Sequence, residues 1–425
     1  MKTNKHFEAL ELVSVLEMLE NEASSQDAKD SAGSLKPVND LSQAQFLLSQ
    51  TEDAFSLIAR FGGPSFSGLS NVNNAVSRAA AGGELNTAEL LRIGGTLRAV
   101  RSLYEWYGHC SGVSTSLDAL FDSITVNKYL EEKIFSVIVS EEEISDRASD
   151  ELYEIRRKIR AKSNSVREKL DSIIHSTHYQ KFLQEPIVTQ RSGRYVVPVK
   201  AEHRADVPGL VHDMSSSGAT VFIEPVSVVD ANNEIKILES REREEIKRIL
   251  YELSLEAGNF SESIKHSYES AVQIDLIFAK ARLAYKMKAT MPHLNKDGKI
   301  LLKKARHPLL DAHSVVPVDI SLGGEFDTLV ITGPNTGGKT VSIKTIGLLS
   351  LMAMCGLLIP AADRSEIAVF DNILVDVGDE QSIQQNLSTF SAHMVNIIDI
   401  MKQAGTNSLV LIDELGAGTD PVEGA

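Results

Sequence analysis

The sequence predicts a mixed fold: an all-α core, a helical arm that carries a small β-sheet, and a doubly wound α/β domain at the C-terminal end. Three observations support this prediction. The first 130 residues place apolar side chains at helical spacing and show no strand alternation. Short Val- and Ile-rich strings bounded by Gly, Pro and Ser follow within residues 187–225. From about residue 298, a strand pattern runs into a Gly-rich loop and an apolar helix.

The composition is that of a large folded chain. Its 425 residues suggest roughly two to four domains, at about 150 residues per domain. Hydrophobic residues make up 43% and charged residues 24% of the sequence, which excludes wholesale disorder. The net charge of -15 argues against a protein held to nucleic acid by its overall charge. Any contact with a polyanion therefore needs a local basic patch.

Cysteine usage and hydropathy indicate a cytoplasmic protein without a membrane segment. Cys110 and Cys355 are too few for a disulfide framework and lack the spacing of a zinc site. Acidic residues between Glu8 and Glu17 interrupt the apolar run that a signal peptide needs. The longest apolar run, 346–359, is shorter than the roughly 20 residues that cross a bilayer, so we predict a buried helix.

The N-terminal region and the arm are predicted from the period of their apolar residues. Stripes at helical spacing cover about 7–19, 39–60 and 87–107. The arm begins with a helix over 141–182, which contains neither Gly nor Pro, and helical spacing returns over 232–253 and on to about Met287. Between these helices, strands are predicted at 194–201, 207–214 and 219–225.

The predicted division follows these changes of period. We assign a helical core or lever to 1–140, the arm to 141–260 with its sheet at 187–225, a helical return to 261–297 and the α/β domain to 298–425. Within the α/β domain, we expect a strand at 327–333, the apolar helix, a strand pair near 367–377, a helix from about Ser391 to Gln403 and a last strand at 408–414.

The string GPNTGGKT at 333–340 fits the phosphate-loop pattern G-x-x-x-x-G-K-[ST]. Backbone N–H groups of such a loop cradle phosphates, and Gly337 and Gly338 let the backbone approach them. Lys339 is predicted to reach the β and γ phosphates, and Thr340 to offer its hydroxyl to Mg²⁺. The alternative is a Gly-rich turn without a ligand. The predicted loop consists of Gly333, Pro334, Asn335, Thr336, Gly337, Gly338, Lys339 and Thr340.

Two carboxylates end the apolar strand LVLIDE at 409–414. Asp413 is predicted to hold Mg²⁺ with its water shell, and Glu414 to orient or deprotonate an attacking water. An apolar strand that ends in two acidic residues is common by chance. The assignment therefore depends on the phosphate loop about 70 residues upstream.

The polar segment DVGDEQSIQQNLSTFSAHM at 376–394 admits two interpretations. From its residues alone, it is a loop that ends in a helix cap at Ser388 or Ser391. The second interpretation comes from a resemblance. GPNTGGKT, NLSTFSAHM and LVLIDELGAGTDP, in that order, resemble the ATPase core of the MutS family of DNA mismatch-repair proteins. GRYVVPVKAEHRADVPGLVHDMSSSGATVFIEP at 193–225 resembles the type-two branch of that family.

The resemblance covers essentially the whole chain and implies an ABC-type ATPase that uses ATP and Mg²⁺. It implies that Ser388, Thr389 and Phe390 form a signature segment, whose Ser faces the γ-phosphate held by the opposite subunit of a homodimer. Arg306 and His307 resemble part of the motif that opens the family's ATPase domain near the adenine, and their individual roles stay open.

Two departures from the family pattern qualify these expectations. The mismatch-reading N-terminal domain of the repair branch, with its Phe-x-Glu wedge, is missing. The family also continues beyond the position of Ala425 with the rest of the ATPase sheet and, in this branch, with an Smr nuclease domain. We therefore expect an N-terminal fragment with an incomplete ATPase domain, and endonuclease activity only from the missing domain.

Three functions are compatible with these features. In the first, ATP binding and hydrolysis control a dimeric clamp on branched or recombining DNA and suppress recombination. In the second, the ATPase engages collided ribosomes and separates them. In the third, the chain is a nucleotide-dependent dimerisation module that does not hydrolyse ATP. Charged arms suit DNA and ribosomal RNA alike, so the sequence does not choose between these targets.

A basic run on the predicted arm is the strongest candidate for contact with nucleic acid. It is either a solvated helix face with i, i+4 partners or a surface for the nucleic-acid backbone. His175 and His178, three apart on a predicted helix, have no nearby Cys or carboxylate to complete a metal site. The run comprises Arg156, Arg157, Lys158, Arg160, Lys162, Arg167 and Lys169.

Overall fold

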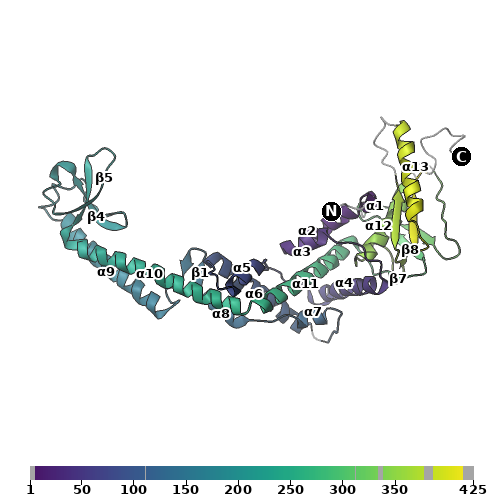
Figure 1. The fold of residues 1–425 in the computed structure, drawn as a ribbon, viewed down its shortest axis with the longest axis horizontal. Coiled ribbons are helices and arrows are strands. Elements are labelled where there is room, and N and C mark those ends of the chain that lie inside the picture. The colour runs from purple at the N-terminus through teal and green to yellow at the C-terminus, as the bar shows by residue number, and fades with distance from the viewer. Residues whose placement is uncertain (1–4, 111, 312, 334–337, 378–385, 415–425) are drawn as a thin grey trace. The chain divides into compact units, whose positions relative to one another are not determined.

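The computed structural model describes residues 5–110, 112–311, 313–333, 338–377 and 386–414, with side chains except at 386–392 (Figure 1). Contacts divide the chain into two compact units. The first comprises Met1–Asn71, Gly95–Asn127 and Glu262–Ala425, and the second comprises Val72–Gly94 and Lys128–Ser261. The four-part division expected from the sequence follows composition rather than contacts and stays a prediction.

The helical part of the first unit joins segments that lie far apart in the sequence. Tyr268 and Phe278 of α11 belong to the same buried cluster as Leu57 of α4 and Leu103 of α6. Burying each such side chain contributes about 1.5–3 kcal/mol. The prediction of helices without strands is confirmed for the described part of residues 1–130. The helices are α1 (Lys5–Ala9), α2 (Leu12–Glu22), α3 (Gln26–Gly33), α4 (Leu41–Phe61), α7 (Asp118–Asp122), α11 (Ser261–Met287) and the later part of α6 (Thr87–His109).

Asp275 on α11 fixes the N-terminal helices to this core. Its carboxylate is fully buried and accepts hydrogen bonds from the backbone N of Ser24 and Ser25, at 3.0 and 2.7 Å. Ser25 is the N-cap of α3, so Asp275 satisfies N–H groups that a helix start leaves without partners. Arg282 lies 3.2 Å from the same carboxylate and supplies the opposite charge that a buried carboxylate needs.

Two small sheets complete the first unit. The first is mixed and has the order β7 (His293–Asn295), β10 (Glu366–Ala368), β8 (Ile300–Ala305), β9 (Val318–Leu322). In the second, β11 (Asn372–Asp376) pairs in parallel with β12 (Ser408–Ile412). The helices of this region are α12 (Lys339–Met354) and α13 (Asn386–Gln403). Residues 345–354 are buried throughout, which confirms a buried helix, but it ends at Met354 because Gly356 adopts a φ of 72°.

One strand prediction for this region is wrong, and another is confirmed in part. Residues 327–333 form no strand, because no neighbouring strand lies beside them in the described part of the chain and a strand exists only through pairing. The strand pair near 367–377 consists of β10 and β11, which belong to different sheets. An apolar string indicates that a segment can form a strand, but it does not indicate which other strand pairs with it. Of the doubly wound sheet that we predicted, the described residues contain the parallel pair β11 and β12.

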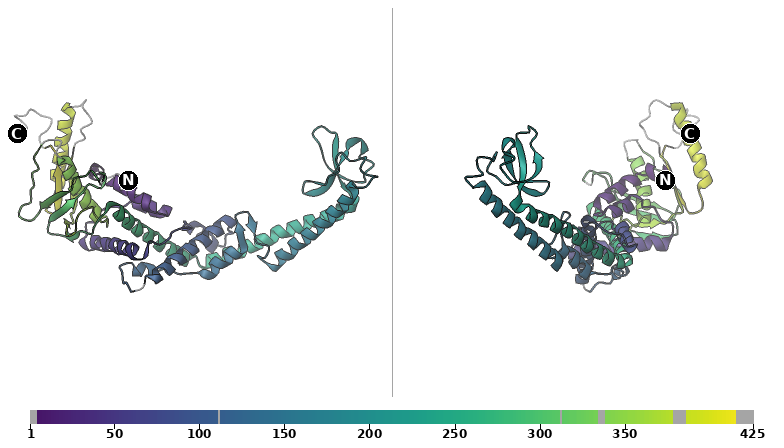
Figure 2. Two further views of the ribbon diagram at one scale, coloured as in Figure 1. Left: turned by 180° about the vertical axis from the view of Figure 1, so that it is seen from behind. Right: turned by 60° about the vertical axis from the view of Figure 1, so that its left-hand side comes forward.

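The second unit contains the arm, in which α9 (Asp150–Ile174) and α10 (Val226–Asn259) lie side by side (Figure 2). Its antiparallel sheet has the order β3 (Thr189–Arg191), β4 (Arg194–Lys200), β6 (Thr220–Pro225), β5 (Gly209–Met214). The three predicted strands are confirmed, and β3 was not predicted. The unit also contains α5 (Asn73–Ala80), α8 (Lys128–Val137), β1 (Ile138–Ser140), β2 (Glu143–Ile144) and the short 3₁₀ helix Ala201–His203.

The helix predicted over 141–182 is shorter at both ends. β1 and β2 form an antiparallel pair before it, and Ser149 caps α9 by accepting a hydrogen bond from Leu152 N. The cap fixes the start of α9, which helical periodicity alone does not locate. α9 ends at Ile174, so His175 is its C-cap and His178 lies beyond it. The prediction that these histidines share a helix is therefore wrong.

Candidate functional site

The last three residues of the predicted phosphate loop, Gly338, Lys339 and Thr340, form the N-terminus of α12 (Figure 1). Gly338 is the N-cap residue and has a φ of 77°, a conformation that glycine adopts most readily. Lys339 follows as the first residue of α12. The free N–H groups and the positive end of the helix dipole favour an anion at this position. Gly333 is described, whereas Pro334, Asn335, Thr336 and Gly337 lie outside the described residues.

Thr340 and Asp413 meet although 73 residues separate them in the sequence. Thr340 lies in the first turn of α12, and Asp413 directly follows β12. Thr340 Oγ1 donates a hydrogen bond to Asp413 Oδ2 at 2.5 Å, and the Asp413 side chain is largely buried. A hydroxyl and a carboxylate side by side are hard oxygen donors, the kind that Mg²⁺ prefers.

A groove of 1120 Å³ in the first unit brings the predicted catalytic side chains together. Its lining includes residues 322–331 and 406–414, and Lys339 contributes from α12. Glu414 is exposed in this groove and has a φ of 51°. That left-handed conformation costs a residue with a side chain about 1–2 kcal/mol. Glu414 thus leaves the direction of β12 at the point where Asp413 meets Thr340.

The predicted signature residues Ser388, Thr389 and Phe390 lie on α13, and their side chains fall outside the described residues. α13 begins at Asn386, so the predicted start near Ser391 is wrong. The cap predicted at Ser388 or Ser391 is wrong for the same reason, because a cap precedes the first helical residue. Serine suits both a cap and the first turn of a helix, so its presence does not locate the boundary.

Sequence reasoning missed Asp376, the last residue of β11. Its backbone O accepts a hydrogen bond from Asp413 N at 2.9 Å. Its carboxylate contacts two side chains of α13, His393 and Asn396. The available signal was an acidic residue at the end of a predicted strand just upstream of the polar segment. Because the order of the strands was unknown, that signal did not place Asp376 next to Asp413.

Arg306 and His307 lie away from the groove lining. Arg306 donates a hydrogen bond to Lys288 O at 3.3 Å. His307 is buried, and this burial lowers the pKa of its imidazole. Its Nε2 lies 3.4 Å from Oε2 of Glu11, which also pairs with Lys344 of α12. These contacts connect residue 307 to α12, and the structure assigns neither residue a catalytic role.

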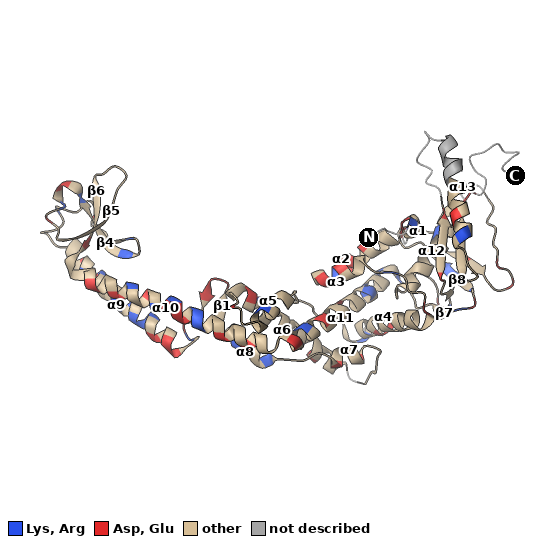
Figure 3. Cartoon of the chain, in the orientation of Figure 1, with Lys and Arg blue, Asp and Glu red and all other residues tan. Residues whose placement is uncertain are grey.

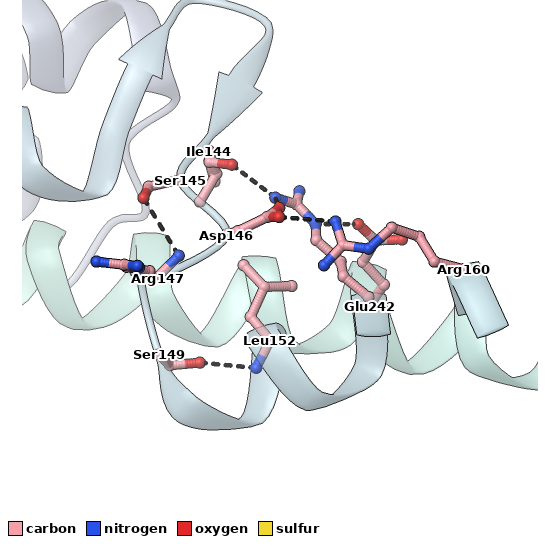
Figure 4. Close-up of polar contacts among 9 residues, drawn as sticks. Ile144, Ser145, Asp146, Arg147, Ser149, Leu152, Arg160 and Glu242 are labelled. Atoms are coloured by element: carbon pink, nitrogen blue, oxygen red, sulfur yellow. Dashed lines mark hydrogen bonds and ion pairs between the residues drawn. The ribbon is translucent and has the colours of Figure 1, made fainter. Parts of the chain in front are cut away.

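The basic run on α9 is largely paired with acidic residues of the same unit, and Figure 3 shows both charges interleaved along α9 and α10. Arg156 donates to Asp146 and to Glu242 of α10, each at 2.7 Å. Arg160 donates to Asp146 at 2.8 Å, as Figure 4 shows. Arg157 pairs with Glu154 and Lys162 with Glu234, whereas Arg167 lies over the Tyr195 ring and Lys169 donates a hydrogen bond to Ser227 O.

These contacts favour the helix-face interpretation of the basic run, with one change. Glu242 and Glu234 belong to α10, so the main partners lie across the helix pair rather than at i, i+4. Hydrogen bonds from Arg160 and Arg156 lower the pKa of the Asp146 carboxyl. Most of the positive charge of the run is thus already compensated within the arm.

Other features add no site. Among the described residues, no group of three or more His, Cys, Asp or Glu side chains is arranged to hold a metal ion. Cys110 and Cys355 are free and buried. No helix in the described part of the chain combines the length and apolar character that crossing a bilayer requires.

Comparisons with known proteins give consistent matches. The family model described as MutS domain V matches residues 329–425. The chain is 47% identical over 423 residues to a protein named Endonuclease MutS2 from Ruminiclostridium cellulolyticum, covering 99% of this chain and 53% of that protein. Proteins of the same name from Acetivibrio thermocellus and Clostridium botulinum (Type A) are 47% and 46% identical, with 99% of this chain and 54% of each protein covered. The chain therefore spans about half the length of these relatives.

Proposed function

Because this chain belongs to the type-two branch of the MutS family, we propose that it binds ATP with Mg²⁺ at the N-terminus of α12 and hydrolyses it. The observation that carries this proposal is the contact of Thr340 Oγ1 with Asp413 Oδ2 at 2.5 Å. It joins the last residue of the phosphate-loop pattern to the carboxylate that was predicted as its partner. Asp413 lines the same groove as Lys339.

The chemistry of these side chains supports the proposal. Thr340 and Asp413 would hold Mg²⁺, which, when bound, neutralises charge on the phosphate oxygens. Lys339 supplies a positive charge for the β and γ phosphates, and the N–H groups of the first turn of α12 supply hydrogen bonds. Glu414 is exposed in the same groove, where its carboxylate can accept a proton from water.

We further propose a homodimer in which Ser388, Thr389 and Phe390 complete the site of the opposite subunit. Apolar side chains on the described part of α13 support an interface there. Val395 is 60% and Met401 75% exposed, and Ile398 lies between them on the helix. Exposed apolar groups at helical spacing are typical of surfaces that another protein covers. The dimer itself rests on family membership.

The proposed role of ATP turnover is to control a clamp on nucleic acid, with branched or recombining DNA as the first target. The alternative target is the collided ribosome. Ion pairs of Arg156, Arg160 and Lys162 with carboxylates of the arm lower the net charge that the basic run presents, which suits a clamp that recognises shape more than charge. ATP turnover measured with branched DNA, linear duplex and ribosomes distinguishes the targets, because only the true target should change the population of the closed state.

Nucleotide binding is tested first, with Lys339→Ala. The variant should bind Mg-ATP at least about tenfold more weakly, or about 1.4 kcal/mol, because it loses the charge that meets the phosphates. Lys344→Ala removes a lysine from the same helix but outside the predicted loop, and it should change the Kd by less than about twofold. Titration calorimetry measures both. Equal affinities of Lys339→Ala and the unmodified chain would rule out the phosphate site.

Hydrolysis is tested with Glu414→Gln. The amide keeps the shape of the side chain but accepts no proton, so turnover should fall at least about tenfold while the Kd for Mg-ATP changes less than about twofold. Phosphate release and calorimetry measure the two quantities. An unchanged turnover rate would remove Glu414 from the proposed reaction, and absence of turnover in the unmodified chain would favour the dimerisation module.

A further inference from the structure

The carboxylate of Asp376 is the polar anchor of α13. It is 5% exposed at the end of β11. Its Oδ1 accepts a hydrogen bond from Asn396 Nδ2 at 2.7 Å, and its Oδ2 lies 3.1 Å from His393 Nδ1. His393 and Asn396 are three residues apart on α13, so they project from one face of the helix. The buried side chain of Asp376 thus contacts two residues of α13 that lie about one helical turn apart.

The same residue is connected to the candidate nucleotide site through the backbone. Asp376 O accepts a hydrogen bond from Asp413 N at 2.9 Å, one step beyond the parallel register that pairs Asp376 with Ile412. Asp413 in turn accepts a hydrogen bond from Thr340. The carboxylate of Asp376 faces α13, and Asp376 is not part of the groove lining. The carboxylate is therefore directed at α13 rather than into the groove.

Few apolar contacts hold the described part of α13. Ile400 is its one buried side chain among residues 393–403, whereas Val395, Ile398 and Met401 are exposed. Burial of an isoleucine and a hydrogen bond to a charged group contribute to stability on a similar scale. The two contacts to the Asp376 carboxylate are therefore a substantial part of what holds this segment of the helix.

We propose that Asp376 is a positioning residue, which holds α13 through His393 and Asn396 against the strand that carries Asp413. The inference rests on the proposed function, because α13 also carries Ser388, Thr389 and Phe390. Its consequence is that the position of the signature segment depends on a carboxylate outside the groove. Asn396 extends the anchor, since it also donates to Val375 O at 3.2 Å.

The anchor is tested first without nucleotide, by amide hydrogen exchange on the complete chain. Asp376→Ala should raise the exchange of residues 393–403 at least about fivefold, while α12 and β12 change less than about twofold. Asn396→Ala and His393→Ala, each at a less buried position, should raise exchange in the same segment. Asp371→Ala is the matched control, because Asp371 directly precedes β11, at the end of the strand away from Asp376, and its side chain is exposed. Unchanged exchange of α13 in all three variants would overturn the inference.

The positioning role is then tested by separating turnover from binding. Asp376→Ala should lower kcat for ATP at least about tenfold while the Kd for Mg-ATP changes less than about twofold, because the phosphate loop lies on α12. Asp376→Asn keeps an acceptor for Asn396 and should recover part of the turnover. Loss of binding together with turnover would indicate general unfolding and overturn the role, as would normal turnover with a loosened α13.

Failure of the proposed function gives a different pattern. If the unmodified chain binds no Mg-ATP, both the nucleotide site and the positioning role are wrong. The exchange measurement still shows, in that case, whether Asp376 holds α13. If the unmodified chain binds and turns over ATP, unchanged turnover in Asp376→Ala contradicts the positioning role alone.

Discussion

Lys280 shows at the residue scale what a buried charge does to this fold. The side chain is 3% exposed, and its Nζ donates a hydrogen bond to Cys355 O at 2.8 Å. That carbonyl belongs to the C-cap of α12, where a positive charge complements the helix dipole. Burial nevertheless lowers the pKa of Lys280 to about 8 and raises the pKa of Cys355 to about 12.

The pKa of Lys280 predicts how stability depends on pH. In the unfolded chain the pKa of a lysine is about 10.4, so between about pH 8 and 10.4 the unfolded state binds more protons than the folded state. Below pH 8, Lys280 therefore lowers the free energy of unfolding by its full contribution of about 3 kcal/mol. This contribution disappears as the pH rises to about 10.4. Urea unfolding should show that the stability of the unmodified chain relative to Lys280→Met rises over this range. Cys355, whose raised pKa makes stability fall above about pH 8.5, is present in both chains and cancels in this difference.

Lys286→Met is the control for this prediction. Lys286 lies on the same helix, and its side chain is 67% exposed. Its removal should leave the pH dependence of the unmodified chain in place, because an exposed ammonium keeps its solvation in the folded state. Equal slopes for the unmodified chain and Lys280→Met would show that Lys280 is hydrated or charged in the folded protein.

At the scale of elements, the start of α9 depends on a polar cluster rather than on apolar packing alone. Arg156 donates hydrogen bonds to Ile144 O, Asp146 and Glu242, each at 2.7 Å. These partners belong to β2, to the connection before α9, and to α10. The Arg156 side chain therefore connects three segments, and it is 19% exposed.

Arg156→Ala should loosen the pairing of α9 and α10. We expect a loss of about 1–3 kcal/mol in local stability, because three acceptors lose a donor in a partly buried place. Hydrogen exchange of α9 measures it. Arg157→Ala is the matched control, since Arg157 is 61% exposed and pairs with Glu154 at i, i+3 on the same helix. It should change local stability by less than about 1 kcal/mol. Equal effects of the two substitutions would show that the cluster does not hold the helix pair.

At the scale of the whole molecule, the proposed composite site makes a prediction about mixed dimers. A chain with Lys339→Ala and a chain with Ser388→Ala should each lack turnover alone. Mixing them should restore part of it, because one of the two sites in a mixed dimer combines the intact loop of one chain with the intact signature segment of the other. Phosphate release by the mixture measures the recovery.

The control for the mixing experiment is one chain that carries both substitutions, mixed with the unmodified chain. Such a dimer has one lesion in each composite site and should gain nothing beyond the unmodified homodimers. If sites act within one chain, the mixture of single variants should stay inactive although mixed dimers form. That result would show that the segment 388–390 is only part of a helix start and has no role in the site of the opposite subunit.

The sequence by itself determined the features whose signals are local. The sequence predicted an apolar helix after the phosphate-loop pattern, and α12 lies there, although it already begins at Lys339 within the pattern. Three of the four strands of the arm's sheet, and the presence of long helices around them, followed from the period of apolar residues. Family membership was also visible in contiguous strings. In each case, the information lies within a few neighbouring residues, so no knowledge of spatial neighbours was needed.

Only the tertiary structure decided the features that depend on partners far away in the sequence. The string at 327–333 has the composition of a strand but no neighbouring strand in the described residues, so it forms none. Asp376 became a candidate positioning residue because β11 lies parallel to β12 and next to α13. Asp275 reaches Ser25 across 250 residues of sequence. Such contacts arise from strand order and packing, and the spacing of residues along the chain does not predict them.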